Sequence, residues 1–246
     1  IEELGISDHI PLPAYRMHLL KSILAVKSLK SLLSLIKSFI KNGPSMRMPY
    51  SKMNEHLDEI EKSAKKHSQD IQIYKGFEAE YLEEYLNYYQ ELLTKEKVDY
   101  LILGNHFNKH CIHNCYYGKV NLSKKEMYSY CNDVEKAIET HLFSYIAHPD
   151  LFMIGYTTFD EDAKTVCKRI CQKAKEYDIP LEINGGGILK GQREIDGESL
   201  YLYPNKYFWE IASQIGNKVI IGFDAHSPKN LNDHLYEQLI QFAKEL

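Results

Sequence analysis

A pattern that recurs along the chain constrains the fold more than any other feature of the sequence. A short run rich in Ile, Leu, Val or Tyr ends at a polar or ionisable residue, and a helix-like segment follows. Continuous apolar runs separated by amphipathic segments are typical of parallel strands covered by helices on both faces. The runs are LGIS, IQIYKGF, VDYLILGN, FSYIA, PLEI and KVIIGF, and they precede Asp8, Glu78, His106, His148, Asn184 and Asp224.

The segments between these runs carry the start and stop signals of helices. Ser123 and Glu126 have the spacing of a capping box, which predicts a helix over 124–141. Gly216 is a typical residue at a helix end and closes a helix predicted over 205–215. Helical spacing of apolar residues and helix boundary signals predict further helices over 52–68, 79–97, 160–177 and 229–245.

Repeated strand–helix units fit either a (β/α) barrel or a doubly wound open sheet. Ionisable residues follow almost every predicted strand. In a barrel these carboxyl ends converge on one mouth, whereas the first and last strands of an open sheet lie far apart. We therefore expect an α/β barrel built as one domain over residues 1–246, a length that can bury a full core.

One segment departs from this alternation of predicted strands and helices. Residues 9–54 contain eight Lys or Arg residues and no Asp or Glu. Apolar residues recur there at helical spacing, so we predict a basic amphipathic helical insertion at about residues 14–44. We expect its apolar face to pack on the barrel or on another subunit of a homo-oligomer. Binding to a membrane surface is the less favoured alternative.

Charge and cysteine usage narrow the class of protein. The net charge of −4 argues against nucleic acid as the main partner, because phosphate backbones are bound by basic surfaces. The five cysteines are an odd number, which indicates reduced thiols and a cytoplasmic location. The stretch HCIHNC at 110–115 could hold zinc, but ordinary thiols are the favoured interpretation.

The residues at the strand ends form the candidate site. Imidazoles mixed with carboxylates suit Zn, Mn or Fe, whereas an all-oxygen set suits Mg or Ca. Each residue alone has a simpler explanation: His148 precedes a proline in a turn, Glu78 could begin a helix, and Asp224 could cap a turn. Their recurrence at nearly every strand end favours a metal site. The predicted ligands are His9, Glu78, His106, His148, Asp224 and His226, with Asp8 and Glu182 outside them.

The motifs GISDHIPL, GFEAEY, DYLILGNHF, YIAHPDLF, LEINGGG and IGFDAHSP occur in this order, and as an ordered set they resemble the PHP (polymerase and histidinol phosphatase) superfamily. The nearest branch is the monofunctional histidinol-phosphate phosphatases. The resemblance covers residues 1–12 and about 46–230. It implies a distorted barrel of seven strands, three divalent metal ions at its mouth, and hydrolysis of phosphate monoesters.

The resemblance also implies a role for each ligand. Glu78 matches the carboxylate that bridges two metals, and His106 and His148 match ligands of the second metal. Asp224 matches a ligand of the first metal. His9 and His226 match ligands of the third. Catalysis is then expected to depend on Glu78, Asp224 and His226.

The chain departs from the family pattern at its beginning. The family's first strand carries a His-x-His motif, and this sequence has none. Only six strands are visible where seven are expected, so either this sequence omits an N-terminal segment or the protein lacks the first strand. A barrel without that strand would expose two strand edges, which favours aggregation. We therefore expect the natural protein to have further N-terminal residues.

The resemblance, together with the predicted metal ligands, implies a metal-dependent phosphatase that acts on L-histidinol phosphate in histidine biosynthesis. Another small phosphate, or protein phosphotyrosine, is an alternative substrate, and an inactive metal-binding homologue is an alternative of a different class. Arg193, Arg47 and Lys190 are the expected phosphate contacts, and Asp8 and Asp150 are expected to orient imidazoles. The histidines on polar helical stretches are expected at the surface, and they are His56, His67, His141 and His234.

Overall fold

The computed structural model describes residues 2–13, 23–24, 28–30, 32–33, 36, 47–107, 116–195 and 197–246. The chain falls into two compact units. The first comprises Ile1–Ile102 and Phe107–Tyr116, and the second comprises Leu103–His106 and Tyr117–Leu246. The boundary between them lies within a strand, β3 (Tyr100–Leu103).

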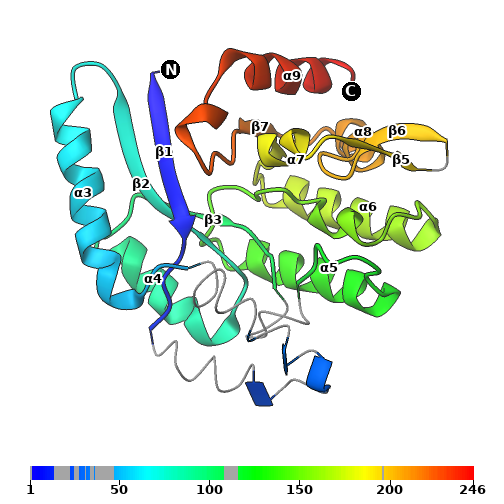
Figure 1. Cartoon of the computed structure of the whole chain (residues 1–246), viewed down its shortest axis with the longest axis horizontal. Helices are drawn as coiled ribbons and strands as arrows, with labels where there is room; N and C mark the ends of the chain where they lie inside the picture. Colours follow the sequence, from blue (N-terminus) through cyan, green and yellow to red (C-terminus); the bar gives the residue numbers. More distant parts are fainter. Residues whose placement is uncertain are drawn as a thin grey trace. The chain divides into compact units, whose positions relative to one another are not determined.

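The first unit contains a sheet in the order β1-β2-β3, and its strands are labelled in Figure 1. The strands β1 (Glu3–His9) and β2 (Gln72–Ala79) are parallel, and their register places Glu3 opposite Gln72 and His9 opposite Glu78. The helix α3 (Met53–Lys66) packs on β2 and buries Met53, Leu57 and Ile60. The 3-10 turns at Tyr50–Lys52 and Glu83–Tyr85 precede α3 and α4 (Leu86–Thr94).

The second unit begins with two long helices, α5 (Lys124–Glu139) and α6 (Glu161–Glu176), which pack together. A 3-10 turn at Leu151–Ile154 lies between them in the chain. The strands β4 (Leu181–Asn184) and β7 (Val219–Gly222) pair in parallel. Single parallel bridges join Leu103 to Ile146 and Ile146 to Leu181.

The rest of the second unit lies between β4 and the C-terminus. The short helix α7 (Gly185–Leu189) follows β4 directly. An antiparallel hairpin of β5 (Gln192–Ile195) and β6 (Glu198–Tyr201) comes next. The helices α8 (Lys206–Ile215) and α9 (Asp233–Lys244) flank β7 in the chain, with a 3-10 turn at Pro228–Asn230. The buried side chains of Phe208 and Trp209 anchor α8 in the core.

Local sequence signals account for most helix boundaries. The capping box at the start of α5 is present, since Ser123 accepts from the Glu126 backbone and the Glu126 side chain accepts from Ser123. Asp160 caps α6 in a similar way, by accepting from the N–H groups of Asp162 and Ala163. Gly216 ends α8 with φ 75°, a left-handed conformation that glycine adopts without strain.

The predicted α/β class is confirmed, but the closed barrel is not. Within the described ranges the strands form a three-stranded sheet, the β4–β7 pair and the β5–β6 hairpin, and no closed barrel is present there. The predicted strand FSYIA is reduced to a bridge at Ile146. The β5–β6 hairpin was not predicted, because its residues are mostly polar and exposed and lack an apolar run. The single domain over 1–246 stays a prediction.

Most of the predicted insertion at about 14–44 lies outside the described residues. Among its described apolar side chains, Leu24, Leu29 and Leu33 are exposed. Its packing partner therefore stays a prediction. In the part of the chain that the structure describes, no helix is long and apolar enough to cross a bilayer.

Candidate metal centre

The ends of β1 and β2 bring the first pair of candidate ligands together. Parallel pairing sets His9 opposite Glu78, and the backbone N–H of Ile10 extends the pairing by donating to the Glu78 carbonyl at 2.8 Å. His9 Nδ1 lies 3.4 Å from Glu78 Oε2, and both side chains are mostly buried. The register of one sheet therefore fixes an imidazole beside a carboxylate.

Glu80 is a member of the site that the sequence analysis missed. Side chains two residues apart on an extended chain point to the same side, so Glu80 lies on the side of Glu78. Its side chain is 1% exposed and forms an ion pair with Arg47 Nη2. The available signal was the alternation of acids in GFEAE, which places two carboxylates on one side of the end of β2.

Arg47 was predicted as a phosphate contact, and its guanidinium is already engaged in this structure. Besides Glu80, it contacts the Ile10 carbonyl, to which Nη1 donates at 3.2 Å. Burial alone would lower the pKa of Arg47, but the neighbouring Glu80 carboxylate more than offsets this and holds the pKa above its ordinary value. Its role as a phosphate contact stays a prediction.

The second unit contributes a pair of histidines. His106 follows β3, and His148 follows Ile146, the residue that bridges to β3 and β4. The two rings are 4.7 Å apart between centroids and inclined by 54°. Both side chains are buried, at 8% and 3% exposure. The segments that follow β3 and the Ile146 bridge therefore hold two imidazoles side by side.

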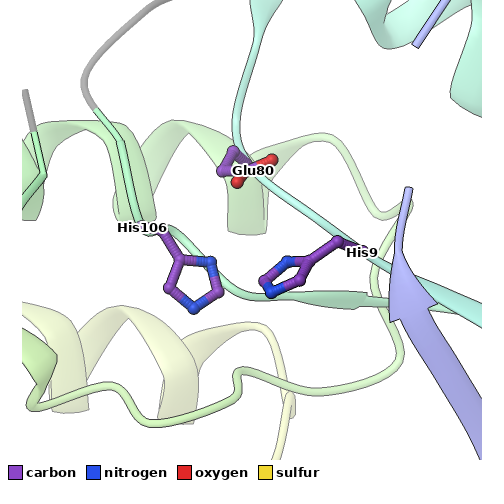
Figure 2. Close-up of side chains that lie close together, drawn as sticks. All are labelled: His9, Glu80 and His106. Atoms are coloured by element: carbon purple, nitrogen blue, oxygen red, sulfur yellow. The ribbon is translucent and has the colours of Figure 1, made fainter. Parts of the chain in front are cut away.

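Two groups of these side chains have the geometry to hold a metal ion. In one, the ligand atoms of Glu78, His106 and His148 all lie within 4.8 Å of one another. The other consists of His9, Glu80 and His106 and meets the same limit (Figure 2). Mixed imidazole and carboxylate ligands suit Zn, Mn or Fe, so the residues present fit the predicted type of ion.

Asp224 and His226 belong to neither group in the described part of the chain. Asp224 follows β7 with φ 48°, which is unusual for a residue other than glycine. His226 Nδ1 lies 3.0 Å from the Asp224 carbonyl oxygen and 3.4 Å from its Oδ1. The His226 side chain is 77% exposed. The two residues lie beside each other, but their assignment as metal ligands stays a prediction.

Lys190 and Arg193 occupy different environments. Lys190, at the end of α7, donates a hydrogen bond to the Tyr203 hydroxyl, and its Nζ lies 4.6 Å from the centroid of that ring. Partial desolvation lowers the pKa of Lys190, and Asp224 opposes this shift. Tyr203 also packs edge-on against His148, with centroids 6.1 Å apart. Arg193 is exposed on β5.

The two acids expected to orient imidazoles contact other groups in this structure, and their role in orienting the ligands stays a prediction. Asp150 is fully buried and accepts from the Asn205 backbone N–H at 2.5 Å and from Trp209 Nε1 at 3.2 Å. Burial raises the pKa of Asp150 to about 7.

Asp8 lies 3.1 Å from Nε2 of His56, whose ring stacks on Phe77. The predicted surface position of His56 was therefore wrong, since its side chain is only 22% exposed. The histidines His67, His141 and His234 are exposed, as expected.

The fold and these ligand groups together define an α/β protein with candidate metal ligands at strand ends. The model of the PHP domain family matches residues 1–186, and the chain belongs to this family. The predicted membership is therefore confirmed. No curated protein matches the chain.

Two solved structures resemble this one. A protein from Listeria monocytogenes, whose proposed activity is that of a histidinol phosphatase, has a TM-score of 0.69 and 20% identity, over 96% of this chain and 88% of that one. Histidinol phosphate phosphatase from Lactococcus lactis, complexed with Zn, L-histidinol and phosphate, has a TM-score of 0.57 and 12% identity, over 98% and 92% of the two chains. At these identities the likeness establishes a shared fold.

Proposed function

We propose that this chain is a metal-dependent phosphate monoester hydrolase whose substrate is L-histidinol phosphate, acting in the cytoplasm in histidine biosynthesis. The observation that carries the proposal is the pair of imidazole–carboxylate groups, whose ligand atoms lie within 4.8 Å of one another. Membership of the PHP domain family supports it. The choice of substrate is supported by the structural neighbour that binds Zn, L-histidinol and phosphate.

Divalent ions held by these groups would activate water for attack on phosphorus and take up charge on the phosphoryl oxygens. The residues of the chain would hold and orient the reacting groups. His9, Glu78, His106 and His148 would bind the ions, and Asp224 and His226 are proposed to complete a cluster of three. Lys190 is a cation able to meet the phosphate dianion through a charge-assisted hydrogen bond.

The Glu78→Gln substitution tests the proposed metal chemistry. It preserves side-chain size but removes the negative charge that lies next to His9. We expect kcat to fall by at least about 100-fold, the scale of losing one important electrostatic element at a reacting centre. Phosphate release from histidinol phosphate by protein loaded with Zn or Mn would measure this. Glu91→Gln is a matched control, because Glu91 forms an exposed i,i+4 ion pair with Lys95 on α4.

A panel of substrates separates the proposal from its alternatives. The same metal-loaded protein would be given histidinol phosphate, other small phosphate monoesters and a phosphotyrosyl peptide. Preference for another monoester would preserve the reaction class and refute the substrate. Metal binding without release of phosphate from any compound would identify an inactive homologue instead.

A further inference from the structure

The buried ion pair between Arg47 and Glu80 lies beside the candidate ligands of the first unit. Glu80 is two residues beyond Glu78 on the chain that leaves β2, and His9 is opposite Glu78. Ile10, whose carbonyl accepts from Arg47, directly follows His9. One cation of the protein itself is therefore fixed where carboxylates and an imidazole converge.

We infer that Arg47 takes the place of a divalent ion at Glu80, so that Glu80 is a latent metal ligand that the protein keeps occupied. Glu80 meets the geometric requirement of a ligand, because its carboxylate belongs to the group with His9 and His106. The carboxylate is nevertheless engaged by a guanidinium. A metal ion and Arg47 compete for the same negative charge, and the outcome sets the number and affinity of the bound ions.

The surroundings of Arg47 favour this role. The side chain of Arg47 is 9% exposed, and that of Glu80 is 1% exposed. A charge buried to this degree needs a compensating partner. A guanidinium stays protonated in proteins, so the compensating charge persists at every physiological pH. Turning Arg47 toward a phosphate would leave Glu80 without this partner.

The segment that presents the Ile10 carbonyl is itself held in place. Tyr88 donates from its hydroxyl to the Pro11 carbonyl at 2.8 Å, and Tyr85 donates to the Pro13 carbonyl at 2.9 Å. Ile10 is fully buried. The Ile10 carbonyl that accepts from Arg47 is therefore fixed, and it positions the guanidinium against Glu80.

The test is a set of Zn²⁺ titrations, by calorimetry and by competition with a chelator, on the full chain. Arg47→Met removes the competing cation and makes the negative charge of Glu80 available to the metal ion. We therefore expect Zn²⁺ to bind at least about tenfold more tightly, or in one more equivalent, which is the scale of one partly screened charge next to the ion. Glu80→Gln leaves Arg47 unbalanced and should weaken binding. The double variant Arg47→Met/Glu80→Gln is neutral at both positions and should return to within about threefold of wild-type affinity.

The double variant makes the inference falsifiable even if Arg47→Met alone does not fold. Were Glu80 already a ligand in the wild-type protein, the double variant would stay as weak as Glu80→Gln, which would overturn the inference. Equal affinity and stoichiometry of Zn²⁺ binding in the wild type and in Arg47→Met would also overturn the inference.

The inference rests on the metal-binding part of the proposed function and not on its substrate. Absence of Zn²⁺ binding in every variant would refute both, whereas binding by the wild type alone would refute only the inference. Arg47→Lys is the matched control, since it keeps the positive charge and should bind Zn²⁺ as the wild type does.

Discussion

The Glu182 carboxylate accepts a hydrogen bond at 3.2 Å from the backbone N–H of His148, although 34 positions separate the two residues. The same oxygen accepts from Asn184 Nδ2 at 2.8 Å, and Glu182 is only 4% exposed. His148 has φ 32°, in the left-handed region that residues other than glycine rarely adopt. Glu182 thus stabilises a strained backbone at a candidate metal ligand, and strain of this kind is maintained by surrounding contacts.

Replacing Glu182 by Ala is expected to lower both stability and metal affinity. The backbone N–H of His148 would lose a buried acceptor, so the free energy of unfolding should fall by about 1–3 kcal/mol. Urea unfolding and Zn²⁺ titration measure the two effects. Glu182→Gln is the matched control, because its amide oxygen can still accept and should restore most of the loss. Equal loss in both variants would show that the charge of Glu182, rather than its hydrogen bonds, is what matters.

The capping box of α5 predicts a pH dependence of stability. Burial raises the pKa of Glu126, but its bonds with Lys119 and Ser123 outweigh this and hold the pKa below its ordinary value of 4.5. A carboxylate with a lowered pKa in the folded state stabilises the protein above the unfolded pKa. That contribution disappears as the pH falls through the folded pKa.

The substitution Glu126→Gln should remove this dependence while keeping the side chain's hydrogen bond to the Ser123 N–H. Its stability relative to wild type, from urea unfolding, should be lower at pH 7. The difference should shrink as the pH falls below about 4.5, where the unfolded carboxyl becomes protonated. A difference that stays constant down to about pH 3 would contradict a lowered pKa for Glu126.

Much of the fold could be predicted because the decisive signals are local. Apolar runs correctly predicted the strands β1 to β4 and β7, and the spacing of Ser123 and Glu126 correctly predicted the start of α5. The run FSYIA failed as a strand because only Ile146 pairs with neighbours on each side. The β5–β6 hairpin, by contrast, forms although the sequence did not predict it. Its strands pair through their backbones while Gln192 and Glu198 remain exposed, so no apolar pattern marks them.

The candidate site was less predictable because its partners are distant in the chain. Single residues after strands pointed to His9, His106 and His148, and parallel pairing accounts for the position of His9 opposite Glu78. Neither the Arg47–Glu80 pair nor the bond from His148 to Glu182 leaves a sequence signal, since each depends on how separate elements pack. The alternation of acidic residues at the end of β2 could have identified Glu80 as a neighbour of Glu78, but it could not have identified Arg47 as the ion-pair partner of Glu80.

Binding of a divalent ion should raise thermal stability. An ion that binds only the folded state at about 100 times its Kd contributes about 2.7 kcal/mol. For a chain of this length that corresponds to a rise in Tm of roughly 5–10 °C. Thermal unfolding with saturating Zn²⁺ and with excess chelator measures the difference. His106→Ala, which removes a member of both ligand groups, should reduce the shift, and exposed His234→Ala should not. An unchanged shift in His106→Ala would place the bound ion elsewhere.

The last prediction concerns Lys190, whose Nζ lies 4.6 Å from the Tyr203 ring centroid. If this ammonium contacts the phosphate, Lys190→Ala should lower kcat/KM by about 10- to 100-fold, the scale of one hydrogen bond to a charged group. Lys190→Arg keeps the charge and should retain more activity. Since Lys190 belongs to neither ligand group, Zn²⁺ affinity should stay within about twofold of wild type in both variants.

A variant of Arg193 provides a comparison that tests the assignment of Lys190 as the phosphate contact. Arg193→Ala removes the other predicted phosphate contact, but Arg193 is exposed on β5, so we expect a smaller loss than for Lys190→Ala. Inhibition by inorganic phosphate provides a second readout, because a lost phosphate contact weakens inhibition as well as turnover. A fall in kcat/KM for Lys190→Ala with unchanged phosphate inhibition would mean that Lys190 acts by holding Tyr203 against His148. In that event the phosphate contact would have to come from another cation of the chain.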